Sequence, residues 1–162
     1  MKKFYFLFVF LFSTLSLTIQ AQDPLYEYLR YANRYAQADL HAYRQRLRKE
    51  YRISSDRILN ECFRQCGKNW GNVRLALEVA HRTGKDVKEV CRYYQTHCKD
   101  GWKRILYKIG IQPGTHYYKP FYDWVSQDQI YWANSYNQYY IKAWILKKKV
   151  AATLELPTYY VY

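Results

Sequence analysis

Apolar residues recur at steps of three and four along most of this chain of 162 residues, and this spacing limits the fold more than any other feature. It lines apolar side chains along one face of a helix, where they can pack against a core. Over residues 23–50 the pattern predicts one long helix, with Asp23 as the N-cap and Pro24 in the first turn. We therefore expect an all-α fold.

Four shorter helices are predicted next, each bounded by residues that start or stop a helix. They cover about residues 55–66, 70–83, 86–98 and 101–109. Asp86 and Glu89 form a pair like a capping box at the third start. Gly67, Gly84 and Gly110 end the first, second and fourth of these helices.

These helices match one another under a shift of 32 residues. The shift places Cys66 on Cys98 and Trp70 on Trp102, so that each copy reads CxxxW at the bend of a helical hairpin. Such a match indicates duplication of a hairpin, and chance agreement between two amphipathic patterns is the alternative. We expect two stacked hairpins over residues 54–112, with both tryptophans in structural positions.

Aromatic residues dominate the region 117–162, which holds ten of the twenty tyrosines and three of the five tryptophans. The pattern predicts a helix from about Pro120 to Val150, with 134–137 as a candidate break and 154–162 as an extended tail. Such a region can wrap the core, contact a protein or sugar, or sit at a membrane interface. We expect it to wrap the core.

The first 21 residues are typical of a secretory signal peptide. Lys2 and Lys3 precede an apolar run of about 15 residues, and Ala21 provides a small residue at the cut. An uncleaved anchor is the alternative, but a spanning helix needs about 20 apolar residues. We expect export to the periplasm, the outer envelope or the medium, with residues 22–162 as a single domain.

Export governs the interpretation of the four cysteines, because an oxidising compartment favours disulfide bonds. Cys62 and Cys66 share one helix face, as do Cys91 and Cys98. Parallel stacking would pair Cys62 with Cys91 and Cys66 with Cys98, and antiparallel helices would pair Cys62 with Cys98 and Cys66 with Cys91. The repeat favours the parallel pairing. A four-thiolate zinc site fits these spacings poorly, and reduced thiols in the core are the other alternative to disulfide bonds. We expect no metal and no cofactor.

The chain is strongly basic, and this predicts an anionic partner. It carries 26 basic and 13 acidic residues, a net charge of +13, which falls to +11 once Lys2 and Lys3 are removed. Two clusters are candidate anion-binding residues: Arg44, Arg46, Arg48, Lys49 and Arg52, and then Lys147, Lys148 and Lys149. An anionic envelope polymer, a lipid surface or another envelope protein would suit them. Export argues against chromosomal DNA, and plain solubility is the alternative role of the charge.

The sequence contains no catalytic motif that we recognise. The four histidines are scattered, without the spacing of a metal or nucleophile motif. Glu61 and Glu78 fall on neighbouring predicted helices and could form a carboxylate pair for glycoside hydrolysis. We therefore expect a non-catalytic protein, with a secreted hydrolase acting on envelope polymer as the alternative. The oligomeric state is not predicted.

Several short motifs follow one another in the middle of the chain: Gly67-Lys68-Asn69-Trp70-Gly71, Leu75 to Ala80, Thr83-Gly84-Lys85-Asp86-Val87 with Glu89-Val90, Gly101-Trp102, and Ile109 to Gly114. On these motifs, residues 58–113 resemble a family of uncharacterised secreted bacterial proteins. Lys103 departs from the second Trp-Gly pair of the family's pattern. The resemblance implies a small exported helical domain without an established activity, substrate or cofactor.

Overall fold

The computed structural model describes residues 23–153, and the described part is all-α without a strand. The helices are α2 (Pro24–Ala38), α3 (Leu40–Glu50), α4 (Asp56–Gln65), α5 (Trp70–Thr83), α6 (Val87–His97), α7 (Gly101–Ile109) and α8 (Tyr118–Thr153), with a short 3-10 turn, η1 (Cys98–Asp100). The predicted fold class is confirmed. The predicted signal peptide and the tail at 154–162 lie outside the described residues.

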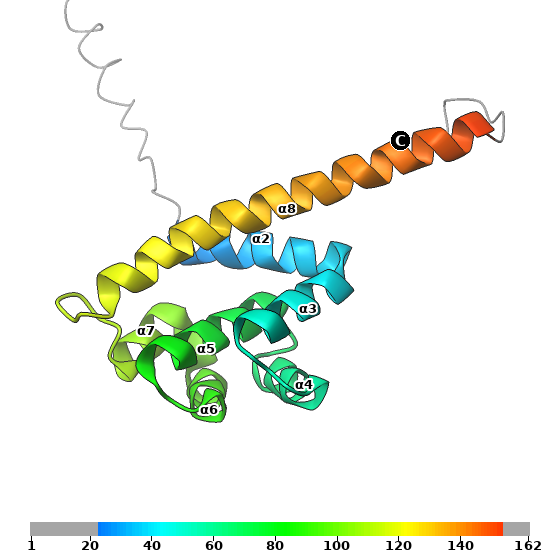
Figure 1. Cartoon of the computed structure of the whole chain (residues 1–162). Coiled ribbons are helices and arrows are strands. Elements are labelled where there is room, and N and C mark those ends of the chain that lie inside the picture. Colours follow the sequence, from blue (N-terminus) through cyan, green and yellow to red (C-terminus); the bar gives the residue numbers. More distant parts are fainter. Residues whose placement is uncertain (1–22, 154–162) are drawn as a thin grey trace, which may run out of the picture.

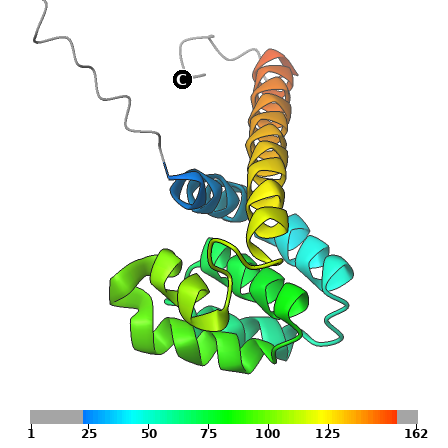
Figure 2. The ribbon, with the colours of Figure 1, turned by 90° about the vertical axis from the view of Figure 1, so that its left-hand side faces the viewer.

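The helices form two layers, with α2 and α8 packed together above the hairpins α4–α5 and α6–α7 (Figures 1 and 2). Helix α5 lies at the centre and contacts α2, α4 and α6. Residues 71–80 of α5 are all buried, because neighbouring helices cover every side of it. One core cluster runs from Leu25 in α2 to Trp132 in α8 and joins the layers.

The predicted helix over 23–50 is divided at Asp39. Its backbone leaves the helical region, with φ −142° and ψ 79°, and its side chain accepts a hydrogen bond from Ala42 N at 3.0 Å. Asp39 therefore caps a new helix, α3, rather than continuing α2. The apolar spacing runs through this cap, which is why periodicity alone predicts one helix.

Helix α8 shows the opposite departure, since it continues through 134–137 without a break. Asn and Ser inside a helix cost only a few tenths of a kcal/mol each, and neither Gly nor Pro occurs between Phe121 and Thr153. Helix α8 is therefore 36 residues long. Its first half packs on α2, and its second half projects past the end of α2 (Figure 1).

A glycine permits the close approach of α2 and α5. A Cβ at Gly71 would lie 3.1 Å from Leu29 O and 2.9 Å from Asn33 Nδ2. The Gly71 N–H donates instead to Asn33 Oδ1 at 2.9 Å. The Trp-Gly pair at this bend therefore contains a residue whose missing side chain brings the two layers together.

The two predicted structural tryptophans lie at the starts of α5 and α7. Trp102 is buried and donates from Nε1 to Asn72 Oδ1 at 2.8 Å, and Asn72 Nδ2 donates to Tyr94 Oη at 2.7 Å. Trp70 is half-buried and stacks on Phe63 with the ring centroids 4.5 Å apart. The two residues thus occupy similar places in the chain but different environments.

Candidate functional site

A buried ion-pair network ties α8 to α5 and α3. Arg74 is fully buried and donates to Asp128 from Nε at 2.6 Å and from Nη2 at 2.8 Å. Its guanidinium also donates to both carboxylate oxygens of Glu50, at 2.8 and 3.0 Å. Trp132 Nε1 donates to Asp128 at 2.6 Å. Bidentate pairs of this kind fix helix register as well as contributing energy.

Aromatic rings surround the Arg74 guanidinium. Its Cζ lies 5.1 Å from the ring centre of Trp132, 5.4 Å from that of Trp124 and 5.5 Å from that of Tyr51. Burial by itself lowers the pKa of Arg74, but Tyr28, Tyr51 and Asp128 outweigh it and raise the pKa above its ordinary value. Arg74 therefore remains a cation in the core, held by cation–π contacts and carboxylates.

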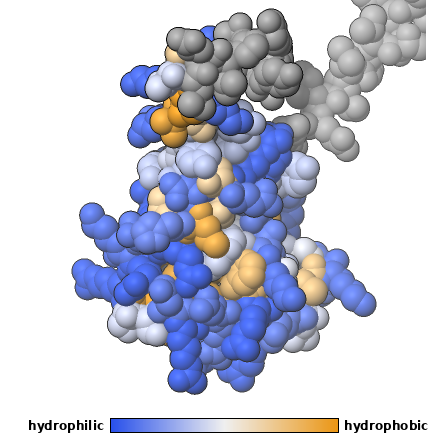
Figure 3. Space-filling view, turned by 90° about the vertical axis from the view of Figure 1, so that its right-hand side faces the viewer, coloured by the Kyte–Doolittle hydropathy of each residue, from blue (hydrophilic) through white to orange (hydrophobic). Residues whose placement is uncertain are grey.

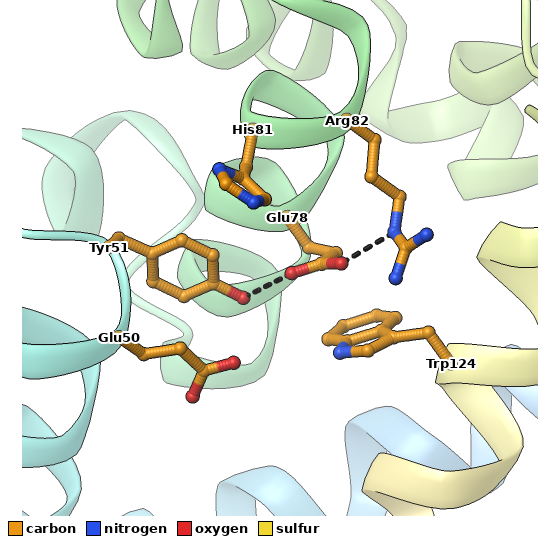
Figure 4. A pocket seen from close by; sticks show the side chains of 6 residues that line it. All are labelled: Glu50, Tyr51, Glu78, His81, Arg82 and Trp124. Carbon is orange, nitrogen blue, oxygen red and sulfur yellow. Dashed lines mark hydrogen bonds and ion pairs between the residues drawn. The ribbon is translucent and has the colours of Figure 1, made fainter.

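A polar pocket of about 280 Å³ opens beside this network and is lined by Glu50, Tyr51, Glu78, His81, Arg82 and Trp124 (Figure 4). Glu78 is almost fully buried and accepts from Tyr51 Oη at 2.6 Å and from Arg82 Nε at 2.5 Å. Burial raises the pKa of Tyr51 above its ordinary value, so its hydroxyl stays a donor. The pocket is polar, but its strongest groups already bond to one another.

The two pocket carboxylates are each engaged by an arginine. Glu50 is held by Arg74 and Glu78 by Arg82. Glu61, the predicted partner of Glu78 in a hydrolytic pair, lies on α4 and does not line this pocket. A glycosidase needs two carboxyl groups free to reach the scissile bond from either side. This pocket therefore gives no geometric support to the predicted glycosidase pair.

Three arginines of the first predicted anion-binding cluster, Arg44, Arg46 and Arg48, lie on α3 and are engaged within the described chain. Arg44 and Arg48 both approach Asp56 Oδ1, at 3.2 and 3.9 Å. Arg46 approaches Glu50 at 3.5 Å and lies 3.6 Å from the ring centre of Tyr131. Within residues 23–153, Lys49 and Arg52 make no ion pair, and both are exposed. Much of this cluster is thus neutralised by its own neighbours.

The second predicted cluster lies on the projecting part of α8. We define the α8 arm as residues 137–153, which carry Lys142, Lys147, Lys148 and Lys149. All four are exposed, and none makes an ion pair within the described chain. The arm contains no acidic residue, and Glu155 beyond it lies outside the described residues. The two predicted clusters belong to separate elements, since the arm extends away from α3 (Figure 1).

The two predicted disulfide bonds are absent, and all four cysteines are free thiols. The sulfur atoms of Cys66 and Cys91 lie 3.6 Å apart, whereas a disulfide bond measures about 2.05 Å. Cys62 is buried with this pair where α4 packs on α6. Cys98 is exposed because α6 ends at His97 and the chain enters η1, which breaks the helical register between Cys91 and Cys98.

Two of the buried thiols, Cys62 and Cys91, have a raised pKa and are held in the protonated state. A hydrogen bond with Cys62 lowers the pKa of Cys91, but a hydrogen bond with Cys66 and burial together raise it to about 12. The hydrogen bond with Cys91 and burial raise the pKa of Cys62 well above its ordinary value. Among residues 23–153 no group of three or more metal-binding side chains has the arrangement of a metal site.

Sequence reasoning missed Arg74 and Asp128, and one signal could have revealed them. Asp128 lies on the same helical face as Phe121, Val125 and Trp132, where an acidic residue is costly unless a cation meets it. Arg74 similarly interrupts the apolar run of α5. The partner of each charge depends on helix packing, which the sequence pattern does not supply.

No family model, no curated protein and no solved structure matches this chain. The resemblance to secreted bacterial proteins therefore stays a prediction. None of the described helices is long and apolar enough to cross a membrane.

Proposed function

We propose that the protein is exported and, without catalysing a reaction, binds an anionic component of the cell envelope through a basic surface. The export step rests on the signal-peptide pattern of residues 1–21, and the partner class rests on the net charge of +11 that remains after cleavage. An anionic polymer, a lipid surface or an acidic envelope protein would all meet this description.

The observation that carries the proposal is the state of the lysines on the α8 arm. Its 17 residues hold four of the eleven net positive charges of the cleaved chain, and all four lysines are exposed. The arginines of α3 have acidic neighbours within 4 Å, whereas the arm lysines have none in the described chain. A surface whose charges lack internal partners attracts external anions most strongly. We therefore assign the binding surface to the arm rather than to α3.

The first test measures retention on a heparin column as salt rises from about 0.05 M to about 0.5 M, because screening weakens exposed charge pairs. The variant K147Q/K148Q/K149Q should elute at clearly lower salt than the wild-type chain. The matched control K88Q/K99Q/K108Q removes three exposed lysines of the lower layer, and should elute close to the wild-type chain. Equal shifts in both variants would show that only net charge matters and would refute the assignment to the arm.

Export is tested separately, by expressing the full chain in a bacterial host and separating the cell fractions. We expect the exported protein to begin at Gln22, as measured by its intact mass. A chain recovered inside the cell with residues 1–21 attached would contradict the proposed compartment.

A further inference from the structure

The α8 arm exposes an unusual amount of apolar surface beside its lysines. Seven of its residues are between 37% and 63% exposed: Tyr139, Tyr140, Ile141, Trp144, Ile145, Leu146 and Val150. Hydrophobic and hydrophilic side chains alternate along this upper part of the molecule (Figure 3). Isolated exposed apolar residues are ordinary, but a contiguous set usually marks an interaction surface.

These residues lie on both sides of the helix. Tyr139, Leu146 and Val150 lie on the continuation of the helix face whose earlier residues, Val125 and Trp132, are buried in the core. The steps of seven and four between these residues keep them in line. Ile141, Trp144 and Ile145 occupy the opposite side. A single partner helix covers one such stripe. A partner that accepts apolar groups around most of the arm is a better match.

Charge argues against a second copy of this chain as that partner. The stripe from Tyr139 to Val150 is flanked by Lys142 and Lys149 on one side and by Lys147 on the other. Two arms packed along this stripe would place lysines beside lysines in either orientation, with no acidic residue on the arm to offset them. Like charges at flanking positions destabilise helix pairs. The occupant must therefore bring negative charge.

We propose that the α8 arm docks on an anionic lipid bilayer, with its aromatic and aliphatic side chains in the interfacial layer and its lysines at the lipid phosphates. Trp and Tyr favour this layer, because their rings are apolar and their polar atoms remain hydrated. Lysines reach the headgroups through their long apolar stems. Lys148 Nζ already lies 4.1 Å from the ring centre of Trp144, which places one such cation beside the aromatic surface.

This inference names the partner of the proposed function and rests on it, so the experiment must separate the two. The cleaved chain is sedimented with vesicles of phosphatidylcholine alone and with vesicles that contain phosphatidylglycerol, and heparin retention is measured in parallel. The variant I141S/I145S keeps every charge of the arm. It should bind the anionic vesicles at least about tenfold more weakly than the wild-type chain, because it no longer transfers two isoleucine side chains from water into the lipid interface. It should keep its heparin retention.

The matched control for lost apolar surface is Y26S/Y107S, which changes two exposed tyrosines on α2 and α7. It should bind vesicles as the wild-type chain does. A second readout places the arm directly, since brominated lipids quench tryptophans that enter the interface. Quenching should be strong in the wild-type chain and nearly lost in W144F. Unchanged helical circular dichroism shows that each variant is folded.

Several outcomes would overturn the inference. Equal vesicle binding by I141S/I145S and the wild-type chain would show that charge alone acts, and equal binding to neutral and anionic vesicles would remove the role of the lysines. Heparin retention without vesicle binding would refute the lipid partner and leave the proposed function standing. Binding to neither probe would refute both. A stable dimer that dissociates in L146S/V150S would assign the stripe to a second copy.

Discussion

Replacing Arg74 by Met tests whether the buried ion pairs hold the two layers together. The substitution keeps a long apolar side chain and removes the cation. Asp128 would lose two of its three short hydrogen bonds, those at 2.6 and 2.8 Å, and would keep only the bond from Trp132. Its nearest remaining cation would be Arg46 Nη2, at 3.9 Å.

The expected loss follows from the difference in burial between the two acidic partners. The Asp128 side chain is only 6% exposed, so water cannot replace the lost cation. The Glu50 side chain is 32% exposed and can regain water, and it keeps Arg46 at 3.5 Å. Leaving one partner of a buried pair uncompensated costs about 3–5 kcal/mol. We assign nearly all of this cost to Asp128.

The assay is urea unfolding followed by tryptophan fluorescence, with the free energy of unfolding extrapolated to water. D128N alone and R74M/D128N complete a double-mutant cycle. The asparagine amide oxygen can still accept from Trp132, while the buried negative charge is removed. The double variant should therefore be about 2 kcal/mol more stable than R74M alone, since it no longer contains an uncompensated carboxylate. A loss below about 1 kcal/mol in R74M, or a double variant less stable than R74M, would refute this reasoning.

Three further predictions concern the core and its titrating groups. Tyr28 Oη is buried without a hydrogen-bond partner in the described chain, so Y28F should leave the free energy of unfolding unchanged or raise it. Y43F should lose about 1 kcal/mol, because Tyr43 donates to a backbone carbonyl. Urea unfolding measures both changes. Burial raises the pKa of Tyr122 from 10.0 to about 12, so the folded state binds its proton more tightly, and stability should fall as pH rises from about 10 to about 12; a melting temperature flat over this range would contradict it. At pH 8 a thiol reagent should label one cysteine, Cys98, in the reduced native protein and all four cysteines in urea. The reason is that burial and a raised pKa keep groups such as Cys91 protonated. Rapid labelling of two or more native thiols, measured by mass, would refute the buried cluster.

Local signals predicted most of the helices, because caps and apolar spacing act within a few residues. As predicted, α5 ends at Gly84, whose φ is 69°, and α6 begins after Asp86, whose side chain accepts from Lys88 N at 2.7 Å. The division at Asp39 was missed because the apolar period continues across it. A cap replaces helical hydrogen bonds without disturbing the period, so the one sequence signal for the division is Asp39 itself, a residue type that favours helix N-caps.

The candidate site was harder to predict because it depends on which charges find partners inside the fold. The basic run on α3 looks like a binding cluster in the sequence, but Asp56 and Glu50 neutralise much of it. The lysines of the α8 arm look similar in the sequence, and they differ only because the arm leaves the other helices. The predicted disulfide pairing is wrong for a related reason, since α6 ends at His97 and Cys98 is exposed to solvent.

The buried network and the α8 arm are linked through the helix that they share. A segment of 17 residues is little longer than the about 12–15 residues below which an isolated helix is marginal in water, so the arm depends on a firmly packed base. Asp128 and Trp132 supply that base, because they are the last residues of α8 that the core fully buries. A variant that frees Asp128 should therefore fray the arm as well as loosen the layers. Vesicle binding by R74M, measured where most molecules remain folded, should fall together with the helical circular dichroism, although none of the arm residues is changed.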